Sequence, residues 1–272
     1  MDPYITVVVP NYNGSAHIEE CLNSIINQTV RNIEVIVADD ASSDSSVEIV
    51  ERFVESHPNI RLVVGEENVG LAANKARAAH LARGTYVTTL DSDDYYISKD
   101  KLKTELAVLQ HYESIGVENV AAYSRTVTVN EDGQVLRIGG FQCPPQGWIL
   151  SDLISFSMSF EPRDFLVRRQ YFLHEGGIDT RTQLYVDWVH KLKIAKVCLF
   201  VCSDIEGTAY RQHSGARMSS QSAWRHISAL NYGFINHASS LPARTRLRAR
   251  LKLYRHFARL AFRSVAPTFL SK

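Results

Sequence analysis

The sequence has little of what marks a secreted, membrane-spanning or disordered chain. Its 272 residues include four cysteines without a Cys-x-x-Cys pair, too few for a disulfide framework in a chain of this size. Apolar runs are short, as in Ile5–Val9, so no segment predicts a helix that crosses a bilayer. Asp2 and Pro3 stand where a signal peptide is basic. We therefore expect a globular protein of the cytoplasm.

Two phosphate-binding motifs are also missing. No Gly-x-x-x-x-Gly-Lys-Ser/Thr segment occurs, and no Gly-x-Gly-x-x-Gly follows the first expected strand. These absences argue against a P-loop and against a dinucleotide cofactor.

Acidic residues are absent from one end of the chain. Residues 241–272 hold nine Lys and Arg and no Asp or Glu, which leaves 21 basic and 29 acidic side chains in residues 1–240. An acidic body of this kind argues against nucleic acid as the partner. The basic end needs an explanation of its own.

Short β-rich runs alternate with amphipathic helical stretches through the first half of the chain. Expected strands are 5–9, 33–38, 61–64 and 86–90, and helices are expected near 18–26, 45–54, 71–82 and 101–112. This alternation predicts an α/β fold with a mostly parallel sheet, helices on both faces and ligands outside the carboxyl ends of the strands.

The second half is less regular. Residues 126–138 predict a hairpin, helices are expected near 168–174 and 186–195, and a strand is expected at 197–202. Because no low-complexity linker separates the halves, we expect residues 1–115 and 116–240 to form the two halves of one domain. Residues 241–272 would form a separate basic helix.

Polar residues follow the expected strands, and the densest group is acidic. Asp91, Asp93 and Asp94 come within four residues after the fourth strand. Unpaired carboxylates at a sheet edge repel one another and lose hydration, so a cation is their natural partner. Oxygen ligands of this kind suit Mg²⁺ or Mn²⁺. The alternative is a helix cap, and for Asp39 and Asp40 the two interpretations are evenly balanced.

Four motifs in order give the first half a resemblance to a known family. They are Val-Val-Val-Pro-Asn-Tyr-Asn at 7–13, Asp-Asp-Ala-Ser-Ser-Asp at 39–44, Asn-Val-Gly-Leu at 68–71 and Leu-Asp-Ser-Asp-Asp at 90–94. This series resembles the inverting family 2 glycosyltransferases of the GT-A fold. Weaker marks at 176–179, 187–188 and 210–213 extend the resemblance over residues 4–220.

The resemblance implies a nucleotide-sugar site in the first half. Pro10 and Tyr12 would line the base of the nucleotide, and Asp40 would accept a hydrogen bond from a uracil-like edge. Residues 91–93 match the family's Asp-x-Asp motif, in which Asp93 would bind Mn²⁺ or Mg²⁺ at the diphosphate. Asp91, with Ser92 beside it, would lie nearer the ribose.

The resemblance assigns the remaining roles to residues farther along the chain. Asp187 matches the carboxylate that deprotonates the acceptor hydroxyl. His213 matches a histidine that reaches the metal or diphosphate, and Arg217 lies in the same loop, where it would contact the leaving phosphate. Many members carry Ala-Arg-Asn where this chain has Asn-Lys-Ala, so Lys75 replaces an arginine of the donor site and lacks its planar fork. Many also carry Glu before the base, where this chain has Val186.

The basic end predicts an amphipathic helix. From Leu247 onward an apolar stripe includes Leu251, Tyr254 and Ala258, and the sequence pattern assigns Arg and Lys to the opposite side. Such a helix over 244–265 suits an anionic membrane surface, at the inner face of the cytoplasmic membrane. The alternative is that the stripe packs against the acidic body.

Together these patterns predict a metal-dependent enzyme that transfers a sugar from a nucleotide-sugar, a UDP-sugar by resemblance, to a glycan or lipid-linked acceptor in bacterial surface polysaccharide synthesis. Two other classes stay open. One is a nucleotidyltransferase on a similar sheet, although the Gly-rich loop with Arg or Lys that such an enzyme carries after its first strand is not present. The other is a catalytically silent binding protein that keeps the fold as a scaffold.

Overall fold

The fold is built around one mixed β-sheet. The computed structural model describes residues 4–138, 146–155, 163–213 and 221–265. Within these residues nine strands form the sheet, eight of them in the order β3-β2-β1-β4-β8-β6-β9-β5, with β7 paired to β6. The strands are β1 (Ile5–Asn11), β2 (Ile33–Asp39), β3 (Ile60–Val64), β4 (Tyr86–Thr89), β5 (Tyr95–Tyr96), β6 (Val120–Val129), β7 (Val135–Ile138), β8 (Leu166–Arg168) and β9 (Leu199–Arg211).

The first four strands form the parallel half that the sequence predicts. β1 lies between β2 and β4, and β3 extends the same parallel ladder at the edge. β8 then pairs antiparallel with both β4 and β6, which joins the second half of the chain to the same sheet. The short strands β5 and β8 were not expected from sequence, and β9 is much longer than the predicted 197–202. The parallel arrangement therefore holds for the first half, and the second half adds antiparallel pairs together with a parallel pairing of β6 with β9.

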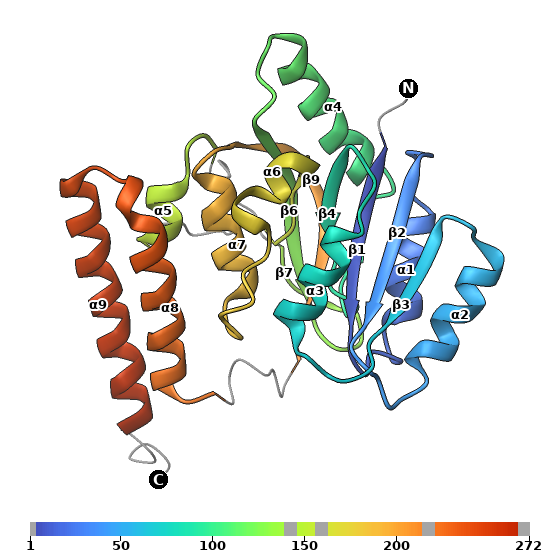
Figure 1. The fold of residues 1–272 in the computed structure, drawn as a ribbon, viewed down its shortest axis with the longest axis horizontal. Coiled ribbons are helices and arrows are strands. Elements are labelled where there is room, and N and C mark those ends of the chain that lie inside the picture. The colour runs from blue at the N-terminus through green and yellow to red at the C-terminus, as the bar shows by residue number, and fades with distance from the viewer. Residues whose placement is uncertain (1–3, 139–145, 156–162, 214–220, 266–272) are drawn as a thin grey trace.

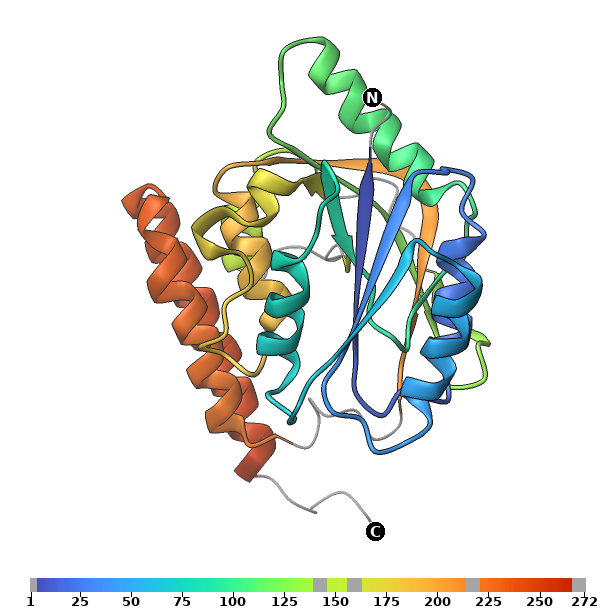
Figure 2. The ribbon, with the colours of Figure 1, turned by 45° about the vertical axis from the view of Figure 1, so that its right-hand side comes forward.

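Helices cover both faces of the sheet, and Figures 1 and 2 show the three layers. On one face lie α1 (Ile18–Ile26), α2 (Ser46–Ser56) and α4 (Lys101–Ser114). The core of the other face is completed by α3 (Leu71–His80), α5 (Leu150–Ile154), α6 (Arg169–Phe172), α7 (Val186–Ala195), α8 (Ala223–His237) and α9 (Ala243–Val265).

The central strand shows why the chain folds this way. Every residue of β1 is buried, and its side chains alternate between the two faces. Val7 and Val9 join the core beneath α1 and α4, whereas Val8 joins the core that includes α3 and α7. A parallel strand covered on both faces requires such a continuous apolar run.

The last helix packs differently from the sequence pattern. Ala249 and Leu253 are 1% exposed, and α9 contacts α8 and α5. The stripe residues Leu247, Leu251 and Tyr254 are 48–60% exposed. The sequence pattern did not predict this packing face, which small and apolar residues form away from the stripe. The alternative that the stripe itself packs on the body is wrong for these three residues.

No helix in the described segments combines the length and the apolar character needed to cross a membrane.

Candidate nucleotide-sugar site

The carboxyl ends of β1, β2 and β4 meet at one edge of the sheet, where a cavity of about 560 Å³ opens. Because the three strands are parallel neighbours, the polar loops that follow them converge on this cavity. The lining residues are Pro10, Asn11, Tyr12, Asn13, Gly14, His17, Asp40, Asn68, Gly70, Leu71, Asn74, Asp91, Ser92, Asp93 and His213. Seven of the residues selected from sequence thus line one cavity.

One part of the cavity wall combines an aromatic ring with a buried carboxylate. Tyr12 is 51% exposed, so its ring is available for stacking. Asp40 is buried and accepts hydrogen bonds from the backbone N–H groups of Val69 (3.0 Å) and Gly70 (2.8 Å). Gly70 has φ +88°, a conformation that favours glycine, and α3 begins directly after it. These contacts fix Asp40 in the cavity wall.

The neighbouring aspartates hold the loops themselves. Asp39 accepts hydrogen bonds from the Asn11 amide (2.7 Å) and from the backbone and hydroxyl of Ser42 (2.8 and 2.6 Å). Asp44 accepts from the backbone N–H groups of Ser15 (2.9 Å) and Ser46 (3.0 Å). Although burial opposes ionisation, a hydrogen bond from the Ser46 hydroxyl (2.5 Å) and these backbone hydrogen bonds lower the pKa of Asp44 to about 2. Asp39 and Asp44 therefore support the loops, and of the Asp39–Asp40 pair only Asp40 lines the cavity.

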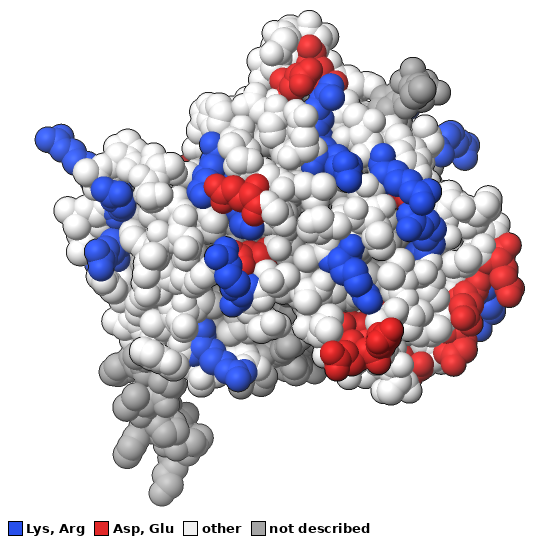
Figure 3. All heavy atoms as spheres, in the orientation of Figure 1, with Lys and Arg blue, Asp and Glu red and all other residues white. Residues whose placement is uncertain are grey.

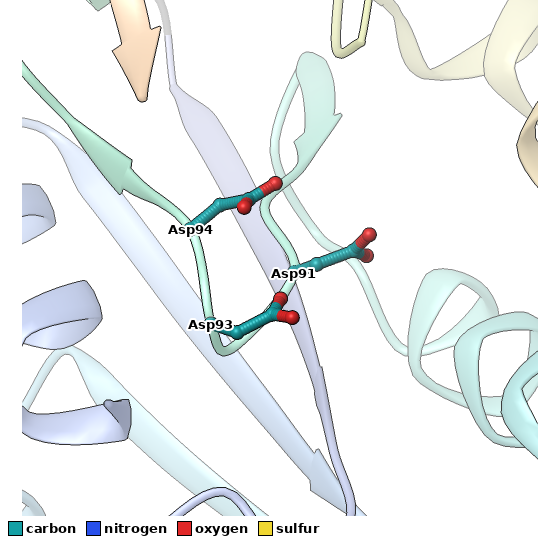
Figure 4. A group of neighbouring side chains, drawn as sticks. All are labelled: Asp91, Asp93 and Asp94. Atoms are coloured by element: carbon teal, nitrogen blue, oxygen red, sulfur yellow. The ribbon is translucent and has the colours of Figure 1, made fainter. Parts of the chain in front are cut away.

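Three carboxylates follow β4 as a group. Asp91, Asp93 and Asp94 each offer an oxygen, and these oxygens lie within 4.8 Å of one another. Figure 4 shows the three side chains pointing to the same side of the loop. His213, which follows β9, places Nε2 2.9 Å from Oδ2 of Asp93. The pairing of β9 with β5 brings this histidine to a loop more than a hundred residues away.

The three carboxylates have different environments. Asp94 is buried and accepts the backbone N–H of Arg211 at 2.9 Å, and burial raises its pKa well above the usual range. Burial also raises the pKa of Asp91. The Arg163 guanidinium lies 3.9 Å from both carboxylates and stacks on the Tyr210 ring.

The donor atoms at this edge fit a divalent cation. Asp93 and His213 are about one-third exposed and face the cavity, and Asp91 adds a second carboxylate beside them. Because these carboxylates are partly buried and close together, keeping all of them ionised costs free energy. A bound cation lowers that free-energy cost. Two carboxylates and an imidazole suit Mn²⁺ or Mg²⁺ with positions left for phosphate oxygens.

Lys75 joins the acidic loop to α7. Its side chain is buried, and the ammonium lies 3.1 Å from Oδ1 of Asp91 and 2.6 Å from Oδ1 of Asp187. Burial opposes ionisation of Asp187, but the Lys75 charge outweighs it and holds the pKa of Asp187 well below its usual range. The shorter contact explains why Lys75 stabilises Asp187 more than Asp91.

Asp187 lies in the first turn of α7, next to a strained residue. Tyr185 precedes the helix in the left-handed region at φ 57°, and its hydroxyl contacts Nδ1 of His226 in α8 at 2.9 Å. Such a conformation persists only where the surroundings hold it. The backbone before Asp187 and the Lys75 side chain therefore both restrict its carboxylate.

The structure thus brings together the residues that were selected from the sequence in both halves of the chain, apart from one residue. Arg217 lies outside the described residues. Sequence reasoning missed Arg163, because no local pattern marks it and its position depends on β8 pairing with β4 and β6. Asp94 was expected only as one of the carboxylates around a cation, and Arg211 stood inside a quoted motif without a role; the contact between them is a long-range hydrogen bond.

Comparison with known proteins agrees with this geometry. The sequence profile described as "Glycosyl transferase family 2" matches residues 6–171, and the chain belongs to this family. The Pasteurella multocida chondroitin synthase is 27% identical over 199 residues, which are 73% of this chain and 19% of the synthase. The chain thus spans about a fifth of that relative's length.

Solved structures show the fold. S. aureus TarS 1–349 in complex with UDP-GlcNAc has a TM-score of 0.71 and 22% identity, over 94% of this chain and 73% of that 1–349 fragment. The Pyrobaculum calidifontis mannosyltransferase PcManGT, in complex with GDP-Man and Mn²⁺, has a TM-score of 0.62 and 21% identity, over 99% of this chain and 77% of that chain. The α/β architecture described above is the GT-A fold.

Proposed function

We propose that this chain transfers a sugar from a nucleotide-sugar, a UDP-sugar, to a hydroxyl group of a glycan or lipid-linked acceptor, with inversion at the anomeric carbon. One observation carries the proposal: a single cavity joins an exposed aromatic ring, a buried Asp40 and an acidic group with His213, and Lys75 links that group to Asp187. The complexes of TarS with UDP-GlcNAc and of PcManGT with GDP-Man support a nucleotide-sugar as donor.

Residues on the two sides of the cavity would hold the two ends of the donor. Tyr12 would stack on the base beside Pro10, and Asp40 would accept a hydrogen bond from it. Asp93 and His213, with Asp91 beside them, would hold Mn²⁺ or Mg²⁺. That cation, when bound, neutralises charge on the leaving diphosphate as a Lewis acid.

Asp187 would act as the general base. Its carboxylate would accept the proton of the acceptor hydroxyl while the hydroxyl oxygen forms a bond to the anomeric carbon. The bond from that carbon to the diphosphate oxygen breaks, and the nucleoside diphosphate leaves. Attack from the opposite face inverts the anomeric configuration without a covalent enzyme intermediate.

We give Lys75 a positioning role in place of the donor contact that the resemblance implied. Its ammonium has close carboxylate partners on both sides, Asp91 and Asp187. It would keep Asp187 ionised and oriented beside the donor cavity. Ser92 lines the cavity and would contact the donor, and Arg217 would contact the leaving phosphate.

We also propose that α9 holds the enzyme at the inner face of the cytoplasmic membrane. Leu247, Leu251 and Tyr254 form an exposed apolar stripe on a helix without acidic residues. Figure 3 shows Lys and Arg along the α9 edge of the molecule, whereas Asp and Glu gather over α2 at the other side of this face. An exposed stripe among cations suits an anionic lipid surface, where a lipid-linked acceptor would be found.

The proposed activity is tested by release of UDP from UDP-sugars, with GDP- and dTDP-sugars for comparison. We expect slow hydrolysis of a UDP-sugar with Mn²⁺ or Mg²⁺ and none with a chelator. Asp93→Ala should abolish it, whereas Glu55→Ala, an exposed carboxylate on α2, should leave it unchanged. Equal hydrolysis with the chelator, or full activity of Asp93→Ala, would contradict the metal assignment.

A further inference from the structure

A second cavity, of about 550 Å³, lies next to the nucleotide-sugar cavity. Asn68 and Gly70 line both cavities, so the two share a wall at the start of α3. We call the second one the arginine pocket. Its lining residues are Asn68, Val69, Gly70, Arg181, Thr182, Gln183, Leu184, Gln221, Arg225, Ser228, Ala229 and Tyr232.

The arginine pocket reaches the segment that carries the proposed base. Residues 181–184 form one wall and lead through Tyr185 into α7, whose first turn contains Asp187. Side chains of α8 form a second wall, which meets the first where Arg181 contacts the Tyr232 ring. A molecule bound in the pocket would therefore lie between α8 and the segment that precedes Asp187, beside the donor.

Among the described lining residues, the walls carry positive charge and amide groups but no carboxylate. Arg181 and Arg225 are the two cations among the lining residues, and Asn68, Gln183 and Gln221 supply amides. Polar donors of this kind, with the ring of Tyr232, suit a sugar that carries a negative charge.

Arg181 is fixed in place while one side of it stays open. Asp179 accepts hydrogen bonds from Nε (2.9 Å) and Nη2 (2.7 Å) of Arg181, and the hydroxyl of Tyr232 donates to the same carboxylate at 2.7 Å. Even so, the Arg181 side chain is 67% exposed. Asp179 and Tyr232 thus hold the Arg181 guanidinium in one position. Binding a ligand there would therefore cost little side-chain entropy.

Arg225 leaves the pocket with an excess of positive charge. In the described part of the chain it forms no ion pair, and its Nη1 donates to the Gln221 amide at 2.8 Å. With the Arg181 charge balanced by Asp179, the Arg225 charge remains. An unpaired guanidinium prefers a carboxylate or phosphate to a hydroxyl group, since the planar fork can bind two oxygens at once.

We propose that the arginine pocket binds the acceptor, and that the acceptor carries an anionic group, a sugar carboxylate or a phosphodiester, next to the residue that receives the new sugar. This inference rests on the proposed function. Arg225 is the specificity-determining residue, and Arg181 supports it. The acceptor hydroxyl would reach Asp187 past the shared wall at Gly70.

Binding of matched pairs of small probes to the full chain, with UDP and Mn²⁺ present, tests the inference. One pair is methyl β-glucuronide against methyl β-glucoside, and the other is glycerol 1-phosphate against glycerol, each followed by NMR titration. We expect at least one anionic member to bind about tenfold more tightly than its neutral partner, the effect of one charge-assisted contact. The stronger of the two anions distinguishes a carboxylate from a phosphate as the natural group.

Variants assign the effect to the pocket. Arg225→Gln should remove the preference for the anion, and Arg52→Gln, an exposed arginine of α2, should keep it. Equal binding within both pairs, or a preference that persists in Arg225→Gln, would overturn the inference. The affinity for UDP, measured in the same samples, separates the two proposals. If the unchanged protein does not bind UDP, the proposed function is contradicted. If it binds UDP but shows no preference for the anionic probes, only the acceptor assignment is contradicted.

Discussion

The two halves of the site are built from the chain in different ways. The proposed donor half comes mainly from the loops after β1, β2 and β4, which lie within the first 94 residues and meet because the strands are parallel neighbours, and the chain after β9 adds His213. The proposed acceptor half comes from Asp187, residues 181–184 and α8, and only long-range packing brings these together. Sheet topology therefore fixes the donor half, whereas side-chain contacts such as Lys75–Asp187 position the acceptor half.

The substitution Asp187→Asn should separate sugar transfer from donor binding, and it has the largest expected effect on activity. The amide cannot accept a proton, so transfer should fall by about 10²–10⁴-fold, the usual contribution of a general base. UDP affinity should stay near that of the unchanged protein, because Asp187 lies outside the donor cavity lining. A calorimetric titration with UDP and a transfer assay measure the two quantities. Equal loss of both would show that Asp187 supports the fold and is not the base.

Lys75→Met tests the link between the halves. Removing the ammonium leaves Asp91 and Asp187 without their shared counter-ion, and we expect kcat for transfer to fall by about 10²-fold through misplacement of the base. The matched variant Lys75→Arg keeps the charge and should recover part of that rate. If Lys75 instead contacts the donor, the KM for the nucleotide-sugar will rise in Lys75→Met while kcat changes little.

A fall in pH should lower the stability of the protein through two histidines in the acceptor half. His190 in α7 and His237 at the end of α8 are buried, and burial lowers the pKa of each to about 4. An unfolded histidine has a pKa of about 6.5, so the unfolded state binds more protons between pH 6.5 and 4. Stability present above pH 6.5 is therefore lost as the pH falls toward 4, by about 1–3 kcal/mol for each residue.

Denaturant unfolding between pH 4 and 7 measures this loss. His237 is the clearer case, because neither ring nitrogen has a hydrogen-bond partner in the described residues. His237→Phe should flatten the pH dependence of the free energy of unfolding in this range. A slope unchanged in His237→Phe would mean that this histidine is protonated in the folded protein.

The charges of α9 give the smallest effect for each residue. Changing Arg248, Lys252 and Arg255 to Gln should weaken binding to phosphatidylglycerol vesicles about fivefold per residue, since each cation near such a surface contributes about 1 kcal/mol. A control with Arg31, Arg52 and Arg83 changed to Gln removes the same charge from the body. Equal weakening in both variants would show that net charge alone governs binding and that α9 has no special role.

The same contrast explains how far the sequence could predict the structure. The hydrophobic periodicity and the order of the motifs were enough to predict β1 to β4 and to select the cavity residues Tyr12, Asp40 and Asp93. Neighbouring parallel strands end at the same edge of the sheet, so the residues that follow them lie close together. The same patterns did not predict Arg163, which reaches the acidic loop only because β8 inserts between β4 and β6. The packing side of α9 was also missed, because alanine and leucine at 249 and 253 form a narrow face beside a more conspicuous exposed stripe.

The proposed function depends above all on the acidic loop after β4, which would bind a cation together with the diphosphate of a sugar nucleotide. Crystals grown with MnCl₂ and UDP, measured at a wavelength where manganese scatters anomalously, test it most directly. We expect an anomalous peak in contact with Asp93 and His213, next to the UDP phosphates, with the uracil ring against Tyr12. Bound UDP with no manganese at these residues, or UDP absent from the cavity, would contradict it.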